Sequence, residues 1–188
     1  MEAISSPNNL FNIDLEKYET VGFHATSSCV CANIEVAGFL PDKIFTEFEH
    51  KRLITIARSK GIDTSDHEAW LSLCSVTFAK DSFTAINHIK NGFAGGQGLK
   101  NISEIIDKIT TLSDEDEIDF MSMLSNRIQL IRSATSVIYA VDLSNLGSRL
   151  NLDRIQPLYY FRWNPADPLP SISEIAPSRI IAKLNVTY

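Results

Sequence analysis

The chain has 188 residues, 44% of them apolar, and its 17 Lys and Arg against 23 Asp and Glu give a formal charge of −6. This composition supports one substantial core, and the absence of a basic block argues against a nucleic-acid partner. No apolar run approaches the roughly 20 residues of a membrane-spanning helix, and the N-terminus lacks the pattern of a Sec signal.

The first part of the chain predicts a lead, a strand and a helix. Residues 1–16 begin with many Ser, Asn and Pro residues and predict a flexible lead, which would also suit a non-cleaved secretion signal. Residues 18–25 carry β-branched and aromatic side chains and predict a strand. Ser27 or Ser28 is then expected to cap a helix that Gly38 ends.

The middle of the chain predicts further alternation of helix and strand. Residues 46–60 place apolar side chains at helical spacing and predict a helix with Thr46 as its N-cap. Residues 72–79 form a compact apolar run that predicts a strand, and Asp81 opens the next helix. The glycine-rich stretch 92–101 predicts a loop.

The last part of the chain predicts two helices and then strands. Residues 101–111 have isoleucines on one helical face, and a second helix is expected from Ser113, where an acidic run suits the positive end of the helix dipole. Three strands are expected at 136–143, 156–163 and 179–186, with a proline-rich loop at 164–171. The pattern predicts an α+β fold and argues against a regular βαβ sheet.

The cysteines predict neither a disulfide framework nor a metal site. There are three, Cys29, Cys31 and Cys74, and the first two are too close in sequence for an ordinary disulfide with each other. Neither a second cysteine pair nor a histidine pair at zinc spacing accompanies them. We therefore expect free thiols in a reducing compartment and no bound metal.

The stretch 22–39, GFHATSSCVCANIEVAGF, places two polar residues, His24 and Thr26, between a predicted strand and a predicted helix. It resembles the first signature of the ADP-ribosyltransferase superfamily, in which a strand ends in a His-Gly-Thr-like turn and a helix leads to Gly-Phe. Ala25 stands where that signature has its usual glycine.

Two later stretches resemble the other signatures of the same superfamily. CSVTFAKDSFTAINHI is similar to a strand with Ser-x-Thr or Tyr-Phe-Ala, a turn Asp and a helix, and supplies Ser75, Thr77, Phe78 and Asp81. SEIAPSRIIAKLNV is similar to the strand that carries the catalytic glutamate, and it places Glu174 at that position. The three blocks occur in the order of the family.

The resemblance implies a fold, an activity and a set of site residues. The fold would be a single-domain ADP-ribosyltransferase-like domain over residues 17–188, with split, mostly antiparallel β-sheets and flanking helices. The activity would be mono-ADP-ribosylation of a protein from NAD+, with Glu174 as the catalytic residue. NAD+ would contact His24, Ala25, Thr26, Ser75 and Thr77, with Phe78 or Phe83 stacking on nicotinamide.

The residue types suit this chemistry, although each also has a structural interpretation. Cleavage of the nicotinamide–ribose bond builds positive charge on the ribose, which a carboxylate stabilises and a histidine helps to orient. The structural alternatives are a hydrogen-bonded strand histidine, an exposed glutamate, ordinary strand hydroxyls and core phenylalanines.

The residue two positions before Glu174 bears on which type of residue would receive ADP-ribose. Arginine- and asparagine-modifying members of the superfamily carry a carboxylate or amide there, whereas this chain has Ile172. The resemblance therefore implies a non-arginine acceptor, such as a Ser or Thr hydroxyl. It extends to bacterial effectors and toxins, including those that modify ubiquitin on threonine.

Such a protein would be a monomer that acts in the host cytoplasm on NAD+ and a host protein, without nucleic-acid or membrane partners. Two alternatives remain open. One is a catalytically degenerate binding module, since Ala25 would crowd the nicotinamide pocket and Thr77 replaces a tyrosine. The other is an RNA 2′-phosphotransferase of the same fold, although no basic cluster surrounds His24 in the sequence.

Overall fold

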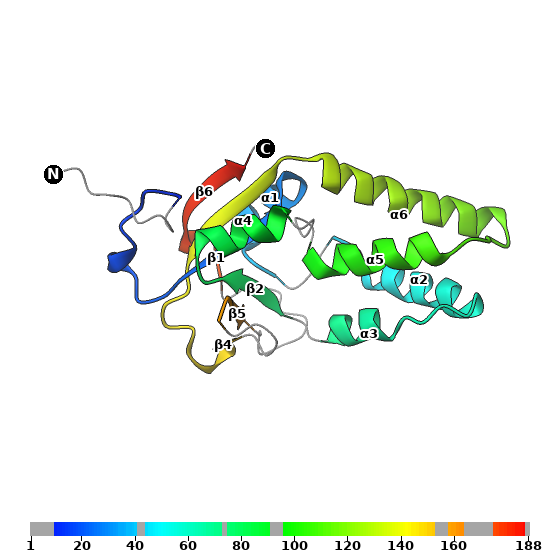
Figure 1. The fold of residues 1–188 in the computed structure, drawn as a ribbon, viewed down its shortest axis with the longest axis horizontal. Coiled ribbons are helices and arrows are strands. Elements are labelled where there is room, and N and C mark those ends of the chain that lie inside the picture. The colour runs from blue at the N-terminus through cyan, green and yellow to red at the C-terminus, as the bar shows by residue number, and fades with distance from the viewer. Residues whose placement is uncertain are drawn as a thin grey trace.

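The computed structural model describes residues 10–40, 44–72, 75–90, 96–152, 158–163 and 175–186. These residues contain six α-helices and one antiparallel sheet of six strands, which confirms the α+β class (Figure 1). The expectation of separate sheets is wrong for the described part of the chain, because all six strands pair in the order β4-β5-β2-β1-β3-β6.

The sheet is built around β1. Its strands are β1 Val21–Ser27, β2 Val76–Ala79, β3 Ser136–Asp142, β4 Leu150–Leu152, β5 Tyr160–Trp163 and β6 Ile180–Val186. β1 pairs with β3 along its whole length, but its register with β2 contains only the pair Phe23↔Ala79. The two halves of the sheet are therefore joined by a short junction between β1 and β2.

The five predicted strands are found with shifted bounds. The predicted strand 72–79 is shorter, because Ser72 ends a helix and β2 begins only at Val76. β4 was not predicted, since a strand of three residues is too short to show the alternation on which such a prediction depends.

Two helices begin at side-chain caps. The helices are α1 Cys31–Ala37, α2 Glu47–Ser59, α3 Ser65–Ser72, α4 Ser82–Lys90, α5 Gly96–Lys108 and α6 Glu115–Ser133. Thr46 caps α2 in a capping box with Glu49, which confirms the prediction. The cap of α6 is Asp114, whose carboxylate accepts a hydrogen bond from Glu117 N at 2.8 Å, and not Ser113.

The start of α5 corrects the predicted loop 92–101. The helix begins at Gly96, and Gly98 within it lies against the ring of Trp70, where a Cβ would approach the indole to 2.3 Å. Packing between α3 and α5 therefore explains a glycine that sequence reasoning assigned to a turn. The helix α3 itself was not predicted.

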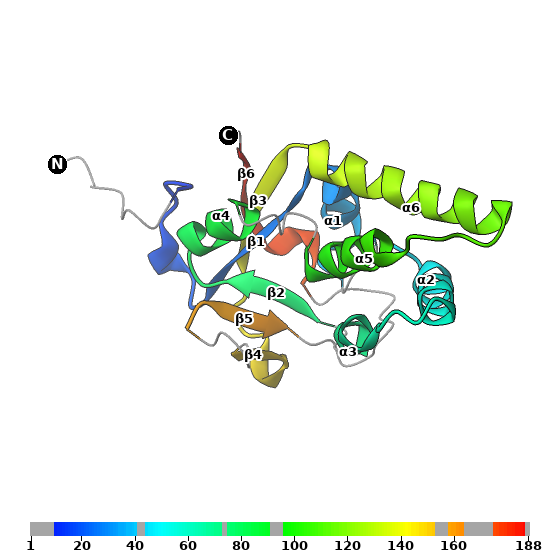
Figure 2. The same ribbon diagram turned by 45° about the vertical axis from the view of Figure 1, so that its right-hand side comes forward.

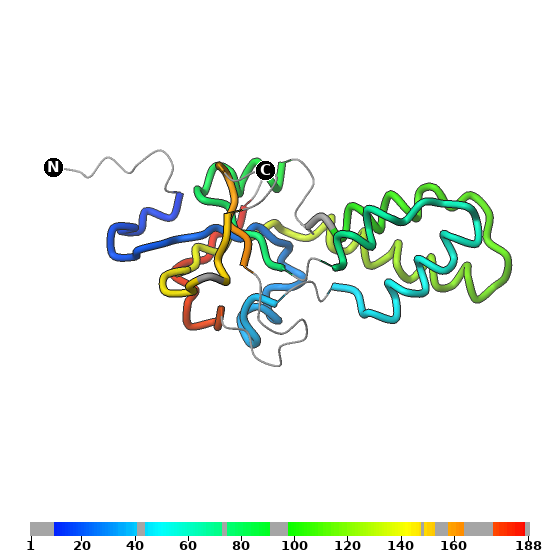
Figure 3. The backbone as a smooth tube through the Cα atoms, turned by 90° about the horizontal axis from the view of Figure 1, so that it is seen from below, coloured from blue at the N-terminus to red at the C-terminus, as the bar shows by residue number. Residues whose placement is uncertain are grey.

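The sheet is covered on both faces, and a helical part extends from one end (Figures 1 and 2). α1 packs on one face of the sheet through its residues Cys31 and Ile34, and we call this the α1 face. α4 packs on the other face through Ala85 and Ile89, and we call this the α4 face. Figure 3 shows α1 and α4 on opposite sides of the sheet. α2, α5 and α6 enclose a second core beside the sheet.

The packed part of the chain begins before the predicted domain start at residue 17. Phe11 stacks on Phe23 of β1 with ring centroids 5.8 Å apart, and Ile13 and Leu15 pack into the same cluster. The predicted flexible lead is therefore wrong for residues 10–16, while residues 1–9 lie outside the described residues. Within the described ranges, no helix is both long and apolar enough to cross a membrane.

Candidate functional site

His24 lies in β1 at the junction between the two halves of the sheet. Its Nδ1 is 3.1 Å from the backbone oxygen of Thr77 in β2, so the imidazole bridges two strands that share one register pair. The ring of Phe39 meets it edge-on at 5.1 Å, and that of Phe78 lies at 5.5 Å. The side chain is therefore positioned by one hydrogen bond and two aromatic contacts.

This environment determines the protonation of His24. Burial lowers its pKa to about 4, although the bond to Thr77 opposes this effect, and His88 lowers the pKa slightly further. Because a carbonyl oxygen can only accept, Nδ1 carries the hydrogen of the neutral ring. Nε2 is then an acceptor at physiological pH, the state needed to accept a hydrogen bond from a ribose hydroxyl.

The structure adds His88 and Tyr160, two residues that sequence reasoning missed. His88 of α4 lies close enough to His24 to affect its pKa, and its Nδ1 is 3.4 Å from the hydroxyl of Tyr160 in β5. Burial also lowers the pKa of His88. The sequence signal for His88 was its place one turn beyond Thr84, on the helix that follows the second signature.

The predicted NAD+ contacts divide between the two faces of the sheet. Ala25 packs into the cluster of the α4 face, and Thr77 shares that face because it alternates with Val76 and Phe78 of the α1 face. Ser75 precedes β2 and stands two residues before Thr77, so by the same alternation it is on the α4 face. Thr26 follows Ala25 in β1 and so projects to the α1 face, and it is only 6% exposed.

The two phenylalanines proposed for stacking differ in exposure. Phe78 is 0% exposed and packs in the core, so it offers no surface on which nicotinamide could stack, and the prediction that it contacts NAD+ is corrected. Phe83 of α4 is 44% exposed. Of the two rings, only Phe83 can meet a ligand without rearrangement of the core.

Glu174 and Ile172 lie outside the described residues, but the residue after Glu174 is placed. Ile175 is fully buried, and its oxygen accepts a hydrogen bond from Phe39 N at 3.0 Å. Gly38 has φ 78°, and a Cβ there would lie 2.4 Å from the oxygen of Ile175. The chain that follows Glu174 is therefore fixed against Phe39, the residue whose ring contacts His24.

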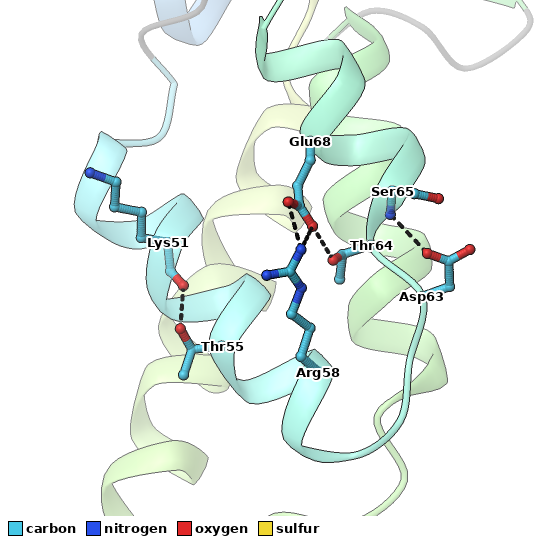
Figure 4. Close-up of polar contacts among 7 residues, drawn as sticks. All are labelled: Lys51, Thr55, Arg58, Asp63, Thr64, Ser65 and Glu68. Carbon is cyan, nitrogen blue, oxygen red and sulfur yellow. Dashed lines mark hydrogen bonds and ion pairs between the residues drawn. The ribbon is translucent and has the colours of Figure 1, made fainter.

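A second polar cluster lies in the helical part, around an open cavity of about 450 Å³ (Figure 4). Arg58 donates to both carboxylate oxygens of Glu68 at 2.7 Å, and the Thr64 hydroxyl donates to the same carboxylate. The Asp63 carboxylate accepts from Ser65 N at 2.9 Å. Because these groups satisfy one another, we interpret the cluster as a structural link between α2 and α3.

A third cluster joins α1 to the sheet. The hydroxyl of Tyr139 donates to Glu35 at 2.8 Å, and Lys183 donates to the same oxygen at 2.7 Å. Burial, Cys31 and Glu35 raise the pKa of Tyr139, while the bonds from Lys183 and Tyr139 lower the pKa of Glu35. Within the described part of the chain, no group of three or more His, Cys, Asp or Glu residues is arranged to hold a metal ion.

Comparison of the chain with known protein families, with curated proteins and with solved structures found no match. Any assignment of function therefore depends on the residues and contacts described above.

Proposed function

We propose that the protein is a mono-ADP-ribosyltransferase that transfers ADP-ribose from NAD+ to a protein. The observation that carries this proposal is the contact of Gly38 and Phe39 with Ile175. Gly38 and Phe39 end the stretch that resembles the first signature, and Ile175 directly follows the candidate catalytic residue, Glu174. Two motifs about 130 residues apart in sequence thus meet on one face of the sheet, as a shared site requires.

His24 would orient the ribose that is attacked. Its neutral ring and its bond to Thr77 leave Nε2 as an acceptor, which suits a ribose hydroxyl. Since the ring is held by Phe39 and a strand backbone, little entropy would be lost when the hydroxyl binds.

Glu174 would supply the negative charge that the reaction needs. As the C–N bond between ribose and nicotinamide breaks, the bonding electrons leave with nicotinamide and positive charge develops on the ribose. A carboxylate beside that charge stabilises the transition state, and it can also accept the proton of the attacking hydroxyl. The ADP-ribose then forms a new bond to the acceptor oxygen.

The proposed site on the α1 face leaves out Phe83, Ala25 and Thr77, because these residues lie on the α4 face, the opposite side of the sheet from His24 and from the segment after Glu174. The proposed acceptor is a Ser or Thr hydroxyl of a host protein, with ubiquitin as a candidate, and the proposed setting is that of a bacterial effector in host cytoplasm.

The proposal is tested by incubating the protein with NAD+ labelled in its adenosine moiety and a lysate of eukaryotic cells. We expect a labelled protein band that resists nuclease and is absent when the label is in nicotinamide. Conversion of the label into a phosphorylated ADP-ribose when an RNA with a 2′-phosphate is added, without labelled protein, would instead support the RNA-directed alternative. Tight binding of NAD+ without any transfer would support the non-catalytic binding module.

A further inference from the structure

Phe39 connects the two parts of the proposed site on the α1 face. Its backbone N–H donates to the oxygen of Ile175 at 3.0 Å, and its ring meets the imidazole of His24 edge-on, with the centroids 5.1 Å apart. Gly38 brings the two backbones together, because a Cβ at its position would lie 2.4 Å from the same oxygen. One residue therefore contacts both His24 and the residue that directly follows Glu174.

The ring of Phe39 is held in a cluster of aromatic side chains. Its centroid lies 5.3 Å from that of Phe78 in β2 and 5.8 Å from that of Tyr139 in β3, and both contacts are edge-to-face. All three rings are buried. Because a protein interior is close-packed and edge-to-face pairs have a preferred geometry, these neighbours fix the place of the ring that meets His24.

Tyr139 links this cluster to α1 and to β6. It is the register partner of His24 across β1 and β3. Its hydroxyl donates to the carboxylate of Glu35, which also accepts a hydrogen bond from Lys183. These hydrogen bonds fix the ring of Tyr139, and through it one of the surfaces against which Phe39 packs.

We infer that Phe39 is a positioning residue of the proposed site, which holds the imidazole of His24 and the backbone of Ile175 in a fixed relation to each other. The inference rests on the proposed function, because that function gives His24 and Glu174 their roles. Phe39 is buried and acts through its neighbours. The orientation of His24 decides whether its Nε2 meets a ribose hydroxyl, and Ile175 is the residue next to Glu174.

Loss of the ring should change the surroundings of His24. Leucine at position 39 leaves part of the ring's volume empty, so the imidazole can turn and water can approach it. Burial is the largest cause of the low pKa of His24, so hydration should raise this pKa from about 4 toward its ordinary value of 6.5. The other groups that act on it, the backbone of Thr77 and His88, are the same in Phe39→Leu.

An NMR titration of the imidazole tests this step without any ligand. The signals of His24 in the wild type should stay constant between about pH 6 and pH 8, whereas those of Phe39→Leu should titrate within this range. The matched control is Phe45→Leu, because Phe45 is also buried and also meets a histidine ring edge-on, that of His50 at 6.0 Å, but in the helical core. His24 should remain constant in this control.

A double-mutant cycle connects His24 with the ligand. Calorimetry should show that Phe39→Leu weakens the binding of NAD+ severalfold, while Phe45→Leu leaves it unchanged. In the background of His24→Ala, Phe39→Leu should cause little further loss, because its effect passes through His24. A purely structural role of Phe39 predicts the same loss with and without His24.

Gly38→Ala provides a second variant that keeps the ring and disturbs its backbone. The added Cβ would push Phe39 away from the oxygen of Ile175, so we expect a lower affinity for NAD+ and a lower rate of transfer at saturating NAD+. Gly61→Ala is its control, since the added Cβ meets no atom within 4 Å, and it should change neither quantity.

Two results are decisive. If His24 stays constant between about pH 6 and pH 8 in folded Phe39→Leu and Gly38→Ala, and both bind NAD+ as tightly as Phe45→Leu, the inference is overturned while the proposed function stands. Failure of the wild type to bind NAD+ would overturn the proposed function, and the inference with it.

Discussion

His24 shows how one hydrogen bond sets the chemistry of a side chain. The strand β1 and the polar character of this position were expected from sequence, but the acceptor of its hydrogen bond was not. Thr77 was expected to use its side chain, whereas His24 bonds to its backbone oxygen. A backbone acceptor exists at every residue, so no pattern of side chains could have indicated it.

We predict that His24→Ala weakens NAD+ binding by about 1 kcal/mol or somewhat more, because a ribose hydroxyl loses its partner. Calorimetry measures the loss, with Lys51→Gln, an exposed change on α2, as the control. Unchanged affinity in His24→Ala would show that the side chain serves only to bridge β1 and β2.

The type of residue that receives ADP-ribose on the target protein is also predicted from single residues. Deprotonation of a guanidinium is difficult because its pKa exceeds about 12, and Ile172 cannot assist it as a second carboxylate would. We therefore predict that agmatine is a poor acceptor and that the linkage to the target resists neutral hydroxylamine. Brisk labelling of agmatine, or an arginine found modified by mass spectrometry, would contradict this prediction and leave the enzyme class intact.

At the scale of elements, the sequence predicted those features that depend on residues close together in the chain. The capping box of α2 and the end of α1 at Gly38 could both be predicted, because each depends on neighbouring residues. α5 could not, since a glycine within it is explained by the distant ring of Trp70. The candidate site divides in the same way: sequence indicated His24, whereas the approach of the segment after Glu174 becomes visible only through the contact of Phe39 with Ile175.

Gly38 connects α1 to the segment that follows Glu174, and it provides a matched test. We predict that Gly38→Ala destabilises the fold by roughly 1–3 kcal/mol, through its positive φ and the clash with the oxygen of Ile175. The control is Gly61→Ala, which has φ 74° but no atom within 4 Å of the added Cβ. Urea unfolding should show the larger loss for Gly38→Ala, and equal losses would mean that the contact with Ile175 adds nothing.

At the scale of the whole molecule, the sheet and the helical part have separate cores, and the helical part contains two buried histidines, His50 and His67. In the helical part, Nδ1 of His50 lies 3.1 Å from Nε2 of His67, so this contact has room for one proton and not two. Burial, with a smaller effect of His50, lowers the pKa of His67 to about 4, against the raising effect of Glu68. The packed helices therefore hold His67 neutral.

This burial predicts a stability that depends on pH. The unfolded chain binds a proton at His67 near pH 6.5 and the folded chain only near pH 4, so stability should fall as pH falls through this window. The loss from His67 is at most about 3 kcal/mol, at about 1.4 kcal/mol per pKa unit. Urea unfolding between pH 7.5 and pH 4 measures it, with His67→Gln as the variant whose slope should be shallower. An equal slope in the variant would mean that groups other than His67 cause the dependence of stability on pH.

The most direct measurement of the central claim is the initial rate of ADP-ribose transfer from labelled NAD+ to protein, compared between the wild type and Glu174→Gln. The variant keeps the size of the side chain and removes its charge, so we predict a rate at least about a hundredfold lower. Its circular dichroism and urea midpoint should match those of the wild type. Transfer by a well-folded Glu174→Gln at the wild-type rate, or no transfer by the wild type in any lysate, would contradict the claim.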